Sequence, residues 1–530
     1  MTVDAALTRR SLLIAGGAAA AVAVAADAGA ATTPVFLHGV ASGDPLPDGV
    51  LLWTRVTPTS QAQPGSGLGP TVTVTWQVAT DAAFAGVVQS GQVATGPERD
   101  HTVKVDVRGL QPATTYWYRF GTGGAWSPTG RTLTAPATDA AVALLRFGVV
   151  SCSNWEAGYF APYRLLAQRG DLQAVVHLGD YLYEYASGGF TAGGTVVRQA
   201  QPTHEIVTLA DYRIRHAQYK SDPDAQTLHA AVPWIITWDD HEVANDMWAG
   251  GAENHDPATE GSFAARVAAA RQAYAEWMPV RLGTDGTIYR RVRFGRLAEL
   301  SMLDLRSYRS QQASGTAVDD PSRTITGDNQ MAWLQQGLAS SGAQWKIVGN
   351  PDMIARVDVG TLPAWLLGPI GKLLGIPSNG FAINTDQWDG YNADRDELVN
   401  HLRAHSVRDT VFITGDIHTS WANELVTRST AGSPTAVEFV VPSVTSDNVD
   451  DFVGLPPGWA GPIAASIVRA ANPHVKWAEL EGHGYGVLEV RPEACRMEWY
   501  HVRDRKDRNT TATRVKAYRV ATGISRLTAV

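Results

Sequence analysis

The sequence is poor in cysteine, with Cys152 and Cys495 as the only two among 530 residues. Two cysteines cannot build a disulfide framework, which excludes a small cross-linked secreted scaffold. Charge is also modest: charged residues make up 18% of the chain, and the formal net charge is -8. This balance offers no basic footprint, so we expect no stable nucleic-acid partner. A chain of this length exceeds a single core, and two domains are expected.

Runs long enough to cross a bilayer are absent, apart from one weak candidate near the start of the chain. The segment Thr8-Arg9-Arg10-Ser11-Leu12-Leu13 precedes a short run rich in Ala, Val and Gly, and small residues at 26–31 offer cleavage sites. It resembles a twin-arginine signal, with a membrane anchor as the alternative. We predict a signal peptide over residues 1–31 and a mature chain without a transmembrane segment. The twin-arginine export machinery would deliver the protein outside the cell or to the cell wall.

Two kinds of hydrophobic pattern divide the rest of the chain. Alternation with period two at 71–78 and 102–107, separated by Gly, Pro and Asp, predicts a small all-β domain over residues 34–140. Residues 110–120 resemble the corner strand of a fibronectin type III sandwich, where a tyrosine locks the fold. Strand-like runs then alternate with helical stretches, which predicts an α/β layered domain over residues 145–530. The expected helices lie at 159–168, 263–277, 329–338 and 395–404.

Side chains of the metal-ligand type follow four of the strand-like runs. The runs are 145–150, 174–178, 234–237 and 410–414. The segments that follow them are Ser151-Cys152-Ser153-Asn154, Gly179-Asp180-Tyr181-Leu182-Tyr183, Trp238-Asp239-Asp240-His241-Glu242 and Gly415-Asp416-Ile417-His418. Sites of this kind are built at the carboxyl ends of strands. The sequence therefore predicts a polynuclear metal site.

The spacing and the ligand types suggest how such a site is organised. Alternate side chains of a strand share a face, so Asp416 and His418 are expected to point at one metal pair while Ile417 turns into the core. Asp180 offers two oxygens, which is enough to bridge two cations. The phenol of Tyr183, with an ordinary pKa of about 10, binds only a strong Lewis acid, which points to ferric iron.

The four segments resemble a degenerate metallophosphoesterase signature that carries the tyrosine of purple acid phosphatases. Cysteine stands in place of the first aspartate, and Asp416 replaces the first histidine of the GHxH block. These departures resemble the PhoD-type alkaline phosphatases, and secreted phospholipases D share the architecture. The opening segments 38–45 and 52–55 match as well. The resemblance implies an α/β fold, a calcineurin-like two-sheet sandwich flanked by helices, preceded by a small fibronectin type III-like β-sandwich.

The same resemblance implies a ferric ion with one or two calcium ions, and Zn²⁺ or Mn²⁺ could stand in their place. The iron ligands would be Cys152, Asp180, Tyr183 and His418. Asp180 would bridge to a calcium that Asp240 and Asp416 also bind, since hard oxygen ligands suit calcium. A further ligand is expected at the end of the strand-like run 345–350, either Asn350 or Asp352. Cys152 has an alternative, as a buried thiol or the partner of Cys495.

The implied reaction is hydrolysis of a phosphoric ester by a metal-activated hydroxide. His241 is the candidate to stabilise the pentavalent state or protonate the leaving group; alternatively it is structural, held by Asp239 or Glu242. The candidates for binding the substrate are Asn154, Arg198 and Arg213. Either arginine could instead form an ordinary ion pair.

Three functions remain open at this point. The preferred one is a secreted phosphatase or phosphodiesterase of the PhoD type, and the alternative is a phospholipase D that releases phospholipid head groups. The third is a wall-binding protein whose metal site is structural and closed by protein ligands. Away from the four segments, Asp211, Asp222 and Asp394 are expected to cap helices or turns.

Overall fold

The computed structural model describes residues 35–192, 195–357, 384–427, 433–448, 450–451 and 458–530. The expected signal peptide lies outside the described residues. Among the described residues, no helix combines the length and the apolar character needed to cross a bilayer.

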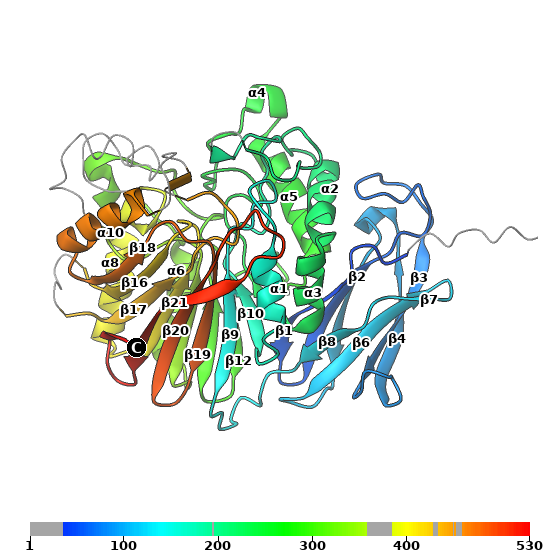
Figure 1. Ribbon diagram of the computed structural model, residues 1–530, viewed down its shortest axis with the longest axis horizontal. Helices are drawn as coiled ribbons and strands as arrows, with labels where there is room; N and C mark the ends of the chain where they lie inside the picture. The colour runs from blue at the N-terminus through cyan, green and yellow to red at the C-terminus, as the bar shows by residue number, and fades with distance from the viewer. Residues whose placement is uncertain (1–34, 193–194, 358–383, 428–432, 449, 452–457) are drawn as a thin grey trace, which may run out of the picture. The chain divides into compact units, whose positions relative to one another are not determined.

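The first of two large sheets carries the site-bearing strands β9, β10 and β11 at its centre, and Figure 1 labels β9 and β10. In spatial order its strands are β22 (Leu527–Ala529), β21 (Ala512–Ala521), β20 (Ala494–Val502), β19 (Gly484–Val490), β9 (Leu145–Val150), β10 (Ala174–His177), β11 (Trp234–Ile236), β1 (Val40–Leu46), β2 (Gly49–Arg55) and β5 (Thr102–Arg108). The strands β9, β10 and β11 are parallel, so their carboxyl ends meet at one edge.

The second large sheet carries β15, which leads into the fourth ligand segment. In spatial order its strands are β12 (Arg290–Phe294), β13 (Ala298–Met302), β14 (Trp345–Asn350), β15 (Thr410–Thr414), β17 (Ala436–Val440), β16 (Ser420–Leu425) and β18 (Val475–Glu479). The strands β13, β14, β15 and β17 run parallel. Their carboxyl ends therefore also gather at one edge.

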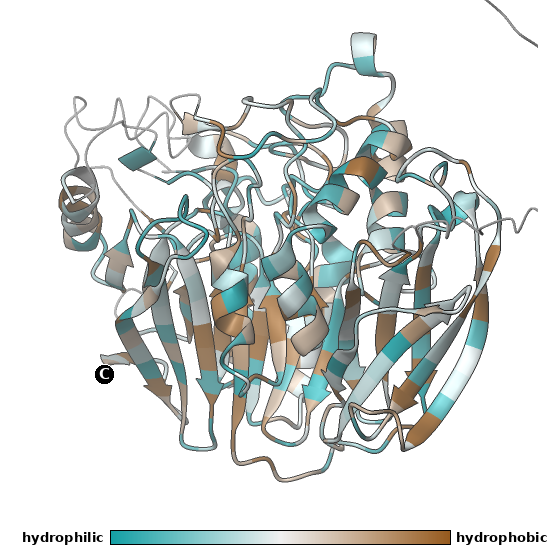
Figure 2. Ribbon diagram, turned by 45° about the vertical axis from the view of Figure 1, so that its right-hand side comes forward, coloured by the Kyte–Doolittle hydropathy of each residue, from teal (hydrophilic) through white to brown (hydrophobic). Residues whose placement is uncertain are grey.

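The two sheets pack face to face and helices cover their outer faces. Phe147 and Val149 of β9 share a buried cluster with Val411 and Ile413 of β15, which is the core between the sheets. The first sheet is covered by α1 (Ala161–Ala167), α2 (Leu209–Lys220), α3 (Pro223–Ala231) and α5 (Phe263–Trp277), and the second by α6 (Asp328–Ser340), α8 (Asn392–Ala404) and α10 (Ala460–Ala471). The central strands carry many apolar stretches, and the loops beyond the strand ends mix hydrophilic and apolar residues (Figure 2). The expected two-sheet sandwich flanked by helices is confirmed.

The N-terminal region is rich in β-structure, as expected, but it shares a sheet with the rest of the chain. Its outer layer contains β4 (Val87–Thr95), β3 (Val72–Ala79), β6 (Thr115–Thr122), β7 (Ala125–Trp126) and β8 (Gly130–Leu133). The opposite layer, β1, β2 and β5, continues the first large sheet because Gly43 of β1 pairs with Trp234 of β11. The Tyr116 hydroxyl accepts a hydrogen bond of 2.9 Å from the Gln111 N–H and locks the corner. The sheet therefore crosses the sequence boundary that we place between residues 140 and 145.

Local patterns predicted several elements to within a few residues. The expected strands 145–150 and 410–414 and the helix 263–277 coincide with β9, β15 and α5. Asp222 caps α3 and Asp211 belongs to the capping box that begins α2. Asp394 accepts the backbone N–H of Ile325, as a turn cap would. Cys152 and Cys495 are both free and buried, so the pairing alternative is wrong.

Candidate metal centre

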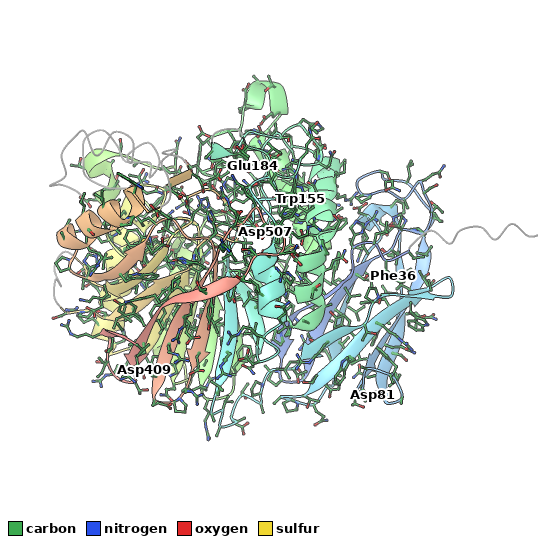
Figure 3. The ribbon with its side chains drawn as sticks, in the orientation of Figure 1. Phe36, Asp81, Trp155, Glu184, Asp409 and Asp507 are labelled. Atoms are coloured by element: carbon green, nitrogen blue, oxygen red, sulfur yellow. The ribbon has the colours of Figure 1, made fainter. Side chains whose placement is uncertain are left out.

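The four ligand segments begin at the carboxyl ends of β9, β10, β11 and β15, where the two sheets bring them together. Figure 3 shows Glu184, which follows Tyr183, beyond the upper ends of the strands. Ligand-type atoms lie within 4.8 Å of one another in four groups. These groups are Cys152, Asp180 and His418; Asp180, Asp240 and His241; Asp180, Asp239, Asp240 and Asp416; and Asp352, Asp386 and Asp416. Asp180 belongs to three of them, which is the position expected of a bridging carboxylate.

Several candidate ligands at this centre have a strained backbone. Four candidate ligands have positive φ: Cys152 at +58°, Asp180 at +55°, Asp416 at +60° and His418 at +55°. A side chain in this left-handed region costs about 1–3 kcal/mol, and such residues cluster at functional sites. The fold therefore stabilises a local geometry that these residues do not favour by themselves.

This backbone geometry corrects one expectation. Asp416 and His418 do not alternate along a strand, because β15 ends at Thr414 and both residues adopt left-handed conformations beyond it. The side chain of Ile417 nevertheless packs against the apolar cluster under α6 and α8, as predicted. A tight turn, rather than pleat alternation, aims the two ligands.

Two glycines allow the ligand segments to approach one another. A Cβ on Gly179, whose φ is +108°, would lie 2.4 Å from Cβ of Asp239. A Cβ on Gly415 would lie 2.7 Å from Cβ of Ser151. Neither position has room for a side chain, so the glycines are required for the close approach of the strand ends.

The thiol, carboxylate, phenol and imidazole expected to hold iron face one another. The Tyr183 hydroxyl lies 3.2 Å from Oδ2 of Asp180 and 3.2 Å from Nε2 of His418. Nδ1 of His418 lies 2.6 Å from the carbonyl oxygen of Asp447, which favours a proton on Nδ1 and leaves Nε2 as a lone-pair donor. Oδ1 of Asp180 is buried and has no hydrogen-bond partner among the described residues.

Burial makes the charged forms of these groups costly without a cation. It raises the pKa of Cys152, Asp180 and Tyr183 well above their ordinary values. A cation among them would stabilise the thiolate, carboxylate and phenolate and reverse these shifts. The donor set and its orphaned oxygen therefore fit a metal site.

The carboxylate side of the centre surrounds Arg306, a residue that sequence reasoning missed. Its guanidinium is fully buried, contacts Asp239, and lies 2.8 Å from both Asp352 and Asp386. It also lies 3.7 Å from Asp240 and 3.6 Å from Asp416. The carboxylates outnumber Arg306 and its neighbour Arg309, so a negative excess remains for added cations. Arg306 follows β13, a strand with no ligand-type motif at its end.

His241 is held by Glu184 rather than by either of its expected partners. Nδ1 of His241 lies 2.7 Å from Oε2 of the buried Glu184. Glu242 instead accepts the backbone N–H groups of Asp180 and Tyr181. Although burial opposes it, the charges of Asp240, Glu184 and Asp180 raise the pKa of His241 well above its ordinary value.

The structure does not bring the two candidate arginines to the centre. Arg198 pairs with Asp222 at 2.6 Å, and Arg213 pairs with Glu276 at 2.7 Å. Both form the ion pairs that were the alternative to substrate binding, since buried carboxylates on the helices and their caps reach them first. Asn154 is buried and its amide donates to the carbonyl of Phe190 at 2.9 Å, so it holds a loop beside the centre.

Of the two candidates for the further metal ligand, Asn350 and Asp352, the geometry favours Asp352. The Asn350 amide nitrogen donates to the carbonyl of Asp352, and its oxygen accepts the Trp388 indole N–H at 3.0 Å. Asp352 belongs to a ligand group, and its Oδ2 has no hydrogen-bond partner among the described residues. Only Asp352 has a carboxylate oxygen available for a cation.

Comparison with known proteins agrees with this geometry. Residues 147–499 match the family model of the PhoD-like phosphatases, and residues 20–136 match the model of their N-terminal domain. Alkaline phosphatase D of Bacillus subtilis (strain 168) is 39% identical over 428 residues, which are 78% of this chain and 69% of that protein.

Solved structures are also similar. The structure of PhoD has a TM-score of 0.83 at 33% identity and covers 94% of this chain and 92% of its own. A purple acid phosphatase from yellow lupin (Lupinus luteus) seeds shares the fold, with a TM-score of 0.52 at 11% identity over 91% of this chain and 73% of its own. The chain therefore belongs to the PhoD-like phosphatase family.

Proposed function

We propose that this protein hydrolyses phosphoric esters at the metal centre, as a secreted alkaline phosphatase or phosphodiesterase of the PhoD type. The observation that carries the proposal is the position of Asp180. One side of Asp180 meets the thiol and imidazole of Cys152 and His418, and the other meets the carboxylates of Asp240 and Asp416. Two unlike ligand sets that share one carboxylate are suited to two unlike cations.

The ligand chemistry supports ferric iron on one side and calcium on the other, with zinc or manganese as the alternatives. Cys152, Tyr183 and His418 would hold the iron, whereas Asp240, Asp352 and Asp416 would serve calcium. When bound, these cations would polarise the phosphoryl oxygens and lower the pKa of a water molecule.

The residues of the chain supply proton transfer and positioning. Water adds its oxygen to phosphorus as the bond from phosphorus to the ester oxygen breaks, and the departing oxygen needs a proton. His241 is suited to donate it from Nε2, since its Nδ1 is held by Glu184 at 2.7 Å. Glu184 is fixed in turn by the Asn245 N–H at 2.7 Å and the Asn254 amide at 2.8 Å.

Export by the twin-arginine route is part of the same proposal and is supported by residues 8–13. Replacement of Arg9 and Arg10 by lysine is expected to leave the precursor in the cytoplasm. Fractionation of the host cells checks this, and normal secretion would contradict it.

The test of function uses protein exported by its native host, analysed for metals and assayed on a phosphomonoester, bis-p-nitrophenyl phosphate and phosphatidylcholine. We expect turnover of the first two, loss of activity with a calcium chelator, and better recovery with calcium than with magnesium. Release of choline as the main reaction would indicate a phospholipase D. No turnover by the metal-loaded protein would indicate a structural site in a binding protein.

A further inference from the structure

A short loop, residues 187–192, lies against the metal centre and is held in place. Its hydrogen bonds include Gly188 N–H to Glu156 at 2.8 Å, Asn154 amide to Phe190 carbonyl at 2.9 Å and Ala192 N–H to Asp447 at 2.5 Å. A Cβ on Gly189 would lie 3.2 Å from Cβ of Tyr185, so the loop backbone rests directly on that residue. The position of Phe190 is therefore set by contacts on both sides of it.

The ring of Phe190 completes an aromatic enclosure around His241. It stacks between Tyr183 and Tyr185, with ring centroids 5.2 Å from each and interplanar angles of 29° and 23°. The His241 imidazole lies 4.1 Å from the Tyr183 ring, 5.0 Å from the Phe190 ring and 5.9 Å from the Tyr185 ring. Three aromatic rings thus contact the imidazole.

The residues of this enclosure differ in their exposure. Tyr183 and His241 are buried, with 3% and 4% of their surface exposed, whereas Tyr185 and Phe190 are only partly buried. Phe190 and Tyr185 therefore present apolar surface to solvent immediately beside His241. We name this surface, made of Phe190 and Tyr185, the aromatic wall.

The position of the aromatic wall has a consequence for the substrate, which rests on the proposed function. An oxygen that takes a proton from His241 must lie within hydrogen-bond distance of the imidazole. The carbon bonded to that oxygen is then one bond further away, within reach of the Phe190 ring, whose centroid lies 5.0 Å from that of the imidazole. We infer that the aromatic wall is a subsite for the organic group of the ester, and that it favours aryl over small alkyl phosphates.

The test compares wild-type enzyme with Phe190→Leu and Phe190→Ala, each purified with its native metals. The kcat/KM values for phenyl, cyclohexyl and ethyl phosphate are measured, and only ratios to wild type are compared, which cancels the intrinsic reactivity of each ester. Phe190→Ala is expected to lower the phenyl-to-ethyl ratio about tenfold. Phe190→Leu should retain most of the cyclohexyl activity while losing phenyl selectivity, because it keeps apolar volume without a flat face.

Trp126→Leu is the matched control, because this aromatic residue is 46% exposed and lies in the N-terminal region. It should leave every ratio unchanged. Elemental analysis of each variant shows whether the metal content is intact. An equal fall for all three esters, or an unchanged phenyl-to-ethyl ratio, would overturn the subsite, since Phe190 would then only support Tyr183 and His241.

A binding measurement separates failure of the subsite from failure of the proposed function. Phenylphosphonate and ethylphosphonate are not hydrolysed, so their dissociation constants report the aromatic wall without turnover. Wild-type enzyme should prefer phenylphosphonate, and Phe190→Ala should lose most of that preference. Absence of hydrolysis by wild type would contradict the proposed function, whereas equal weakening of both phosphonates in Phe190→Ala would contradict the subsite.

Discussion

Two of the clusters of buried ionisable side chains in the described part of the chain respond to burial in opposite ways. One is the metal centre, where carboxylates exceed the arginines that face them. The other, which we call the base cluster, contains His38, His177, His216, Lys220 and His229. The imidazoles of His177 and His229 stack on Trp234, whereas that of His216 stacks on Trp277.

Burial favours the neutral form of every base in this cluster. Burial lowers the pKa of His38, His177 and His216 to about 3, and it lowers that of Lys220 well below its ordinary value. Neutral imidazoles then pack as aromatic rings. The residues of the base cluster, all of them described, have no positive φ, unlike four candidate ligands of the metal centre.

The difference separates a structural cluster from a functional one. A buried base becomes neutral when it releases a proton to solvent. The metal centre has carboxylate oxygens without a hydrogen-bond partner among the described residues, and several of its residues have a strained backbone. A bound cation would pair with these oxygens and stabilise their charged form. Perturbed pKa values occur in both clusters, so burial alone does not identify the site.

The sharpest test of the comparison is Asp180→Asn, which keeps the size of the side chain and removes its charge. We expect loss of iron and calcium and a fall in turnover of several powers of ten, because Asp180 belongs to three ligand groups. Elemental analysis and kcat measure both effects. Asp320→Asn, in an exposed loop, should change neither, and an Asp180→Asn protein with both metals would contradict the bridging role.

A second test asks whether His241 belongs with the ligands or acts on the substrate. His241→Ala should lower kcat and kcat/KM together by about 10²–10⁴-fold, because it removes a proton donor while the metals stay bound. Glu184→Gln, which keeps a hydrogen-bond acceptor for Nδ1, should cost less. Steady-state kinetics and elemental analysis distinguish these two roles of His241. Loss of metal in His241→Ala would show that His241 is a ligand.

A third test removes the guanidinium of Arg306, which lies among the carboxylates of the centre. Arg306→Leu should lower the free energy of unfolding of the chelator-treated protein by about 3–5 kcal/mol, because it leaves several buried carboxylates without a partner. Arg306→Lys should cause an intermediate loss of stability, since one ammonium group cannot contact all of the surrounding carboxylates. Urea denaturation measures the loss. Arg108→Leu, which breaks half-exposed pairs, should cost less than about 1 kcal/mol, and an equal cost would show that Arg306 is not central.

The smallest effect is expected in the base cluster, from His216→Phe. Both ring nitrogens of His216 lack a hydrogen-bond partner among the described residues. Its folded pKa of about 3 lies below the unfolded value of 6.5, so the unfolded state binds more protons between these values, and stability falls as pH drops below 6.5. The variant should gain about 2 kcal/mol over wild type at pH 5 and almost nothing at pH 8. Denaturation at the two pH values checks this; an equal difference at both would show that His216 is not the titrating group.

Part of this structure follows from local patterns and part does not. The strands β9 and β15 could be predicted because their residues are apolar and bounded by glycine or polar ligands. The helix α2 was not predicted, although Thr208 and Asp211 form a capping box, because its buried face mixes aromatic residues with Arg213, Arg215 and Lys220. Charged residues on the buried face of a helix hide its apolar pattern, and they can be recognised as buried only when their ion-pair partners are known.

The sequence by itself determined the candidate ligands that follow β9, β10, β11 and β15, since each follows its strand within a few residues and the strand direction brings these ends to one edge. Tertiary structure alone decided which group neutralises or orients each ligand. Arg306 reaches Asp352 and Asp386 from the segment after β13, and Glu184 holds His241 from 57 residues away. Local periodicity reports which residues are buried and in what order. Pairing of charges across two packed sheets depends on distances in space, which no short stretch of sequence contains.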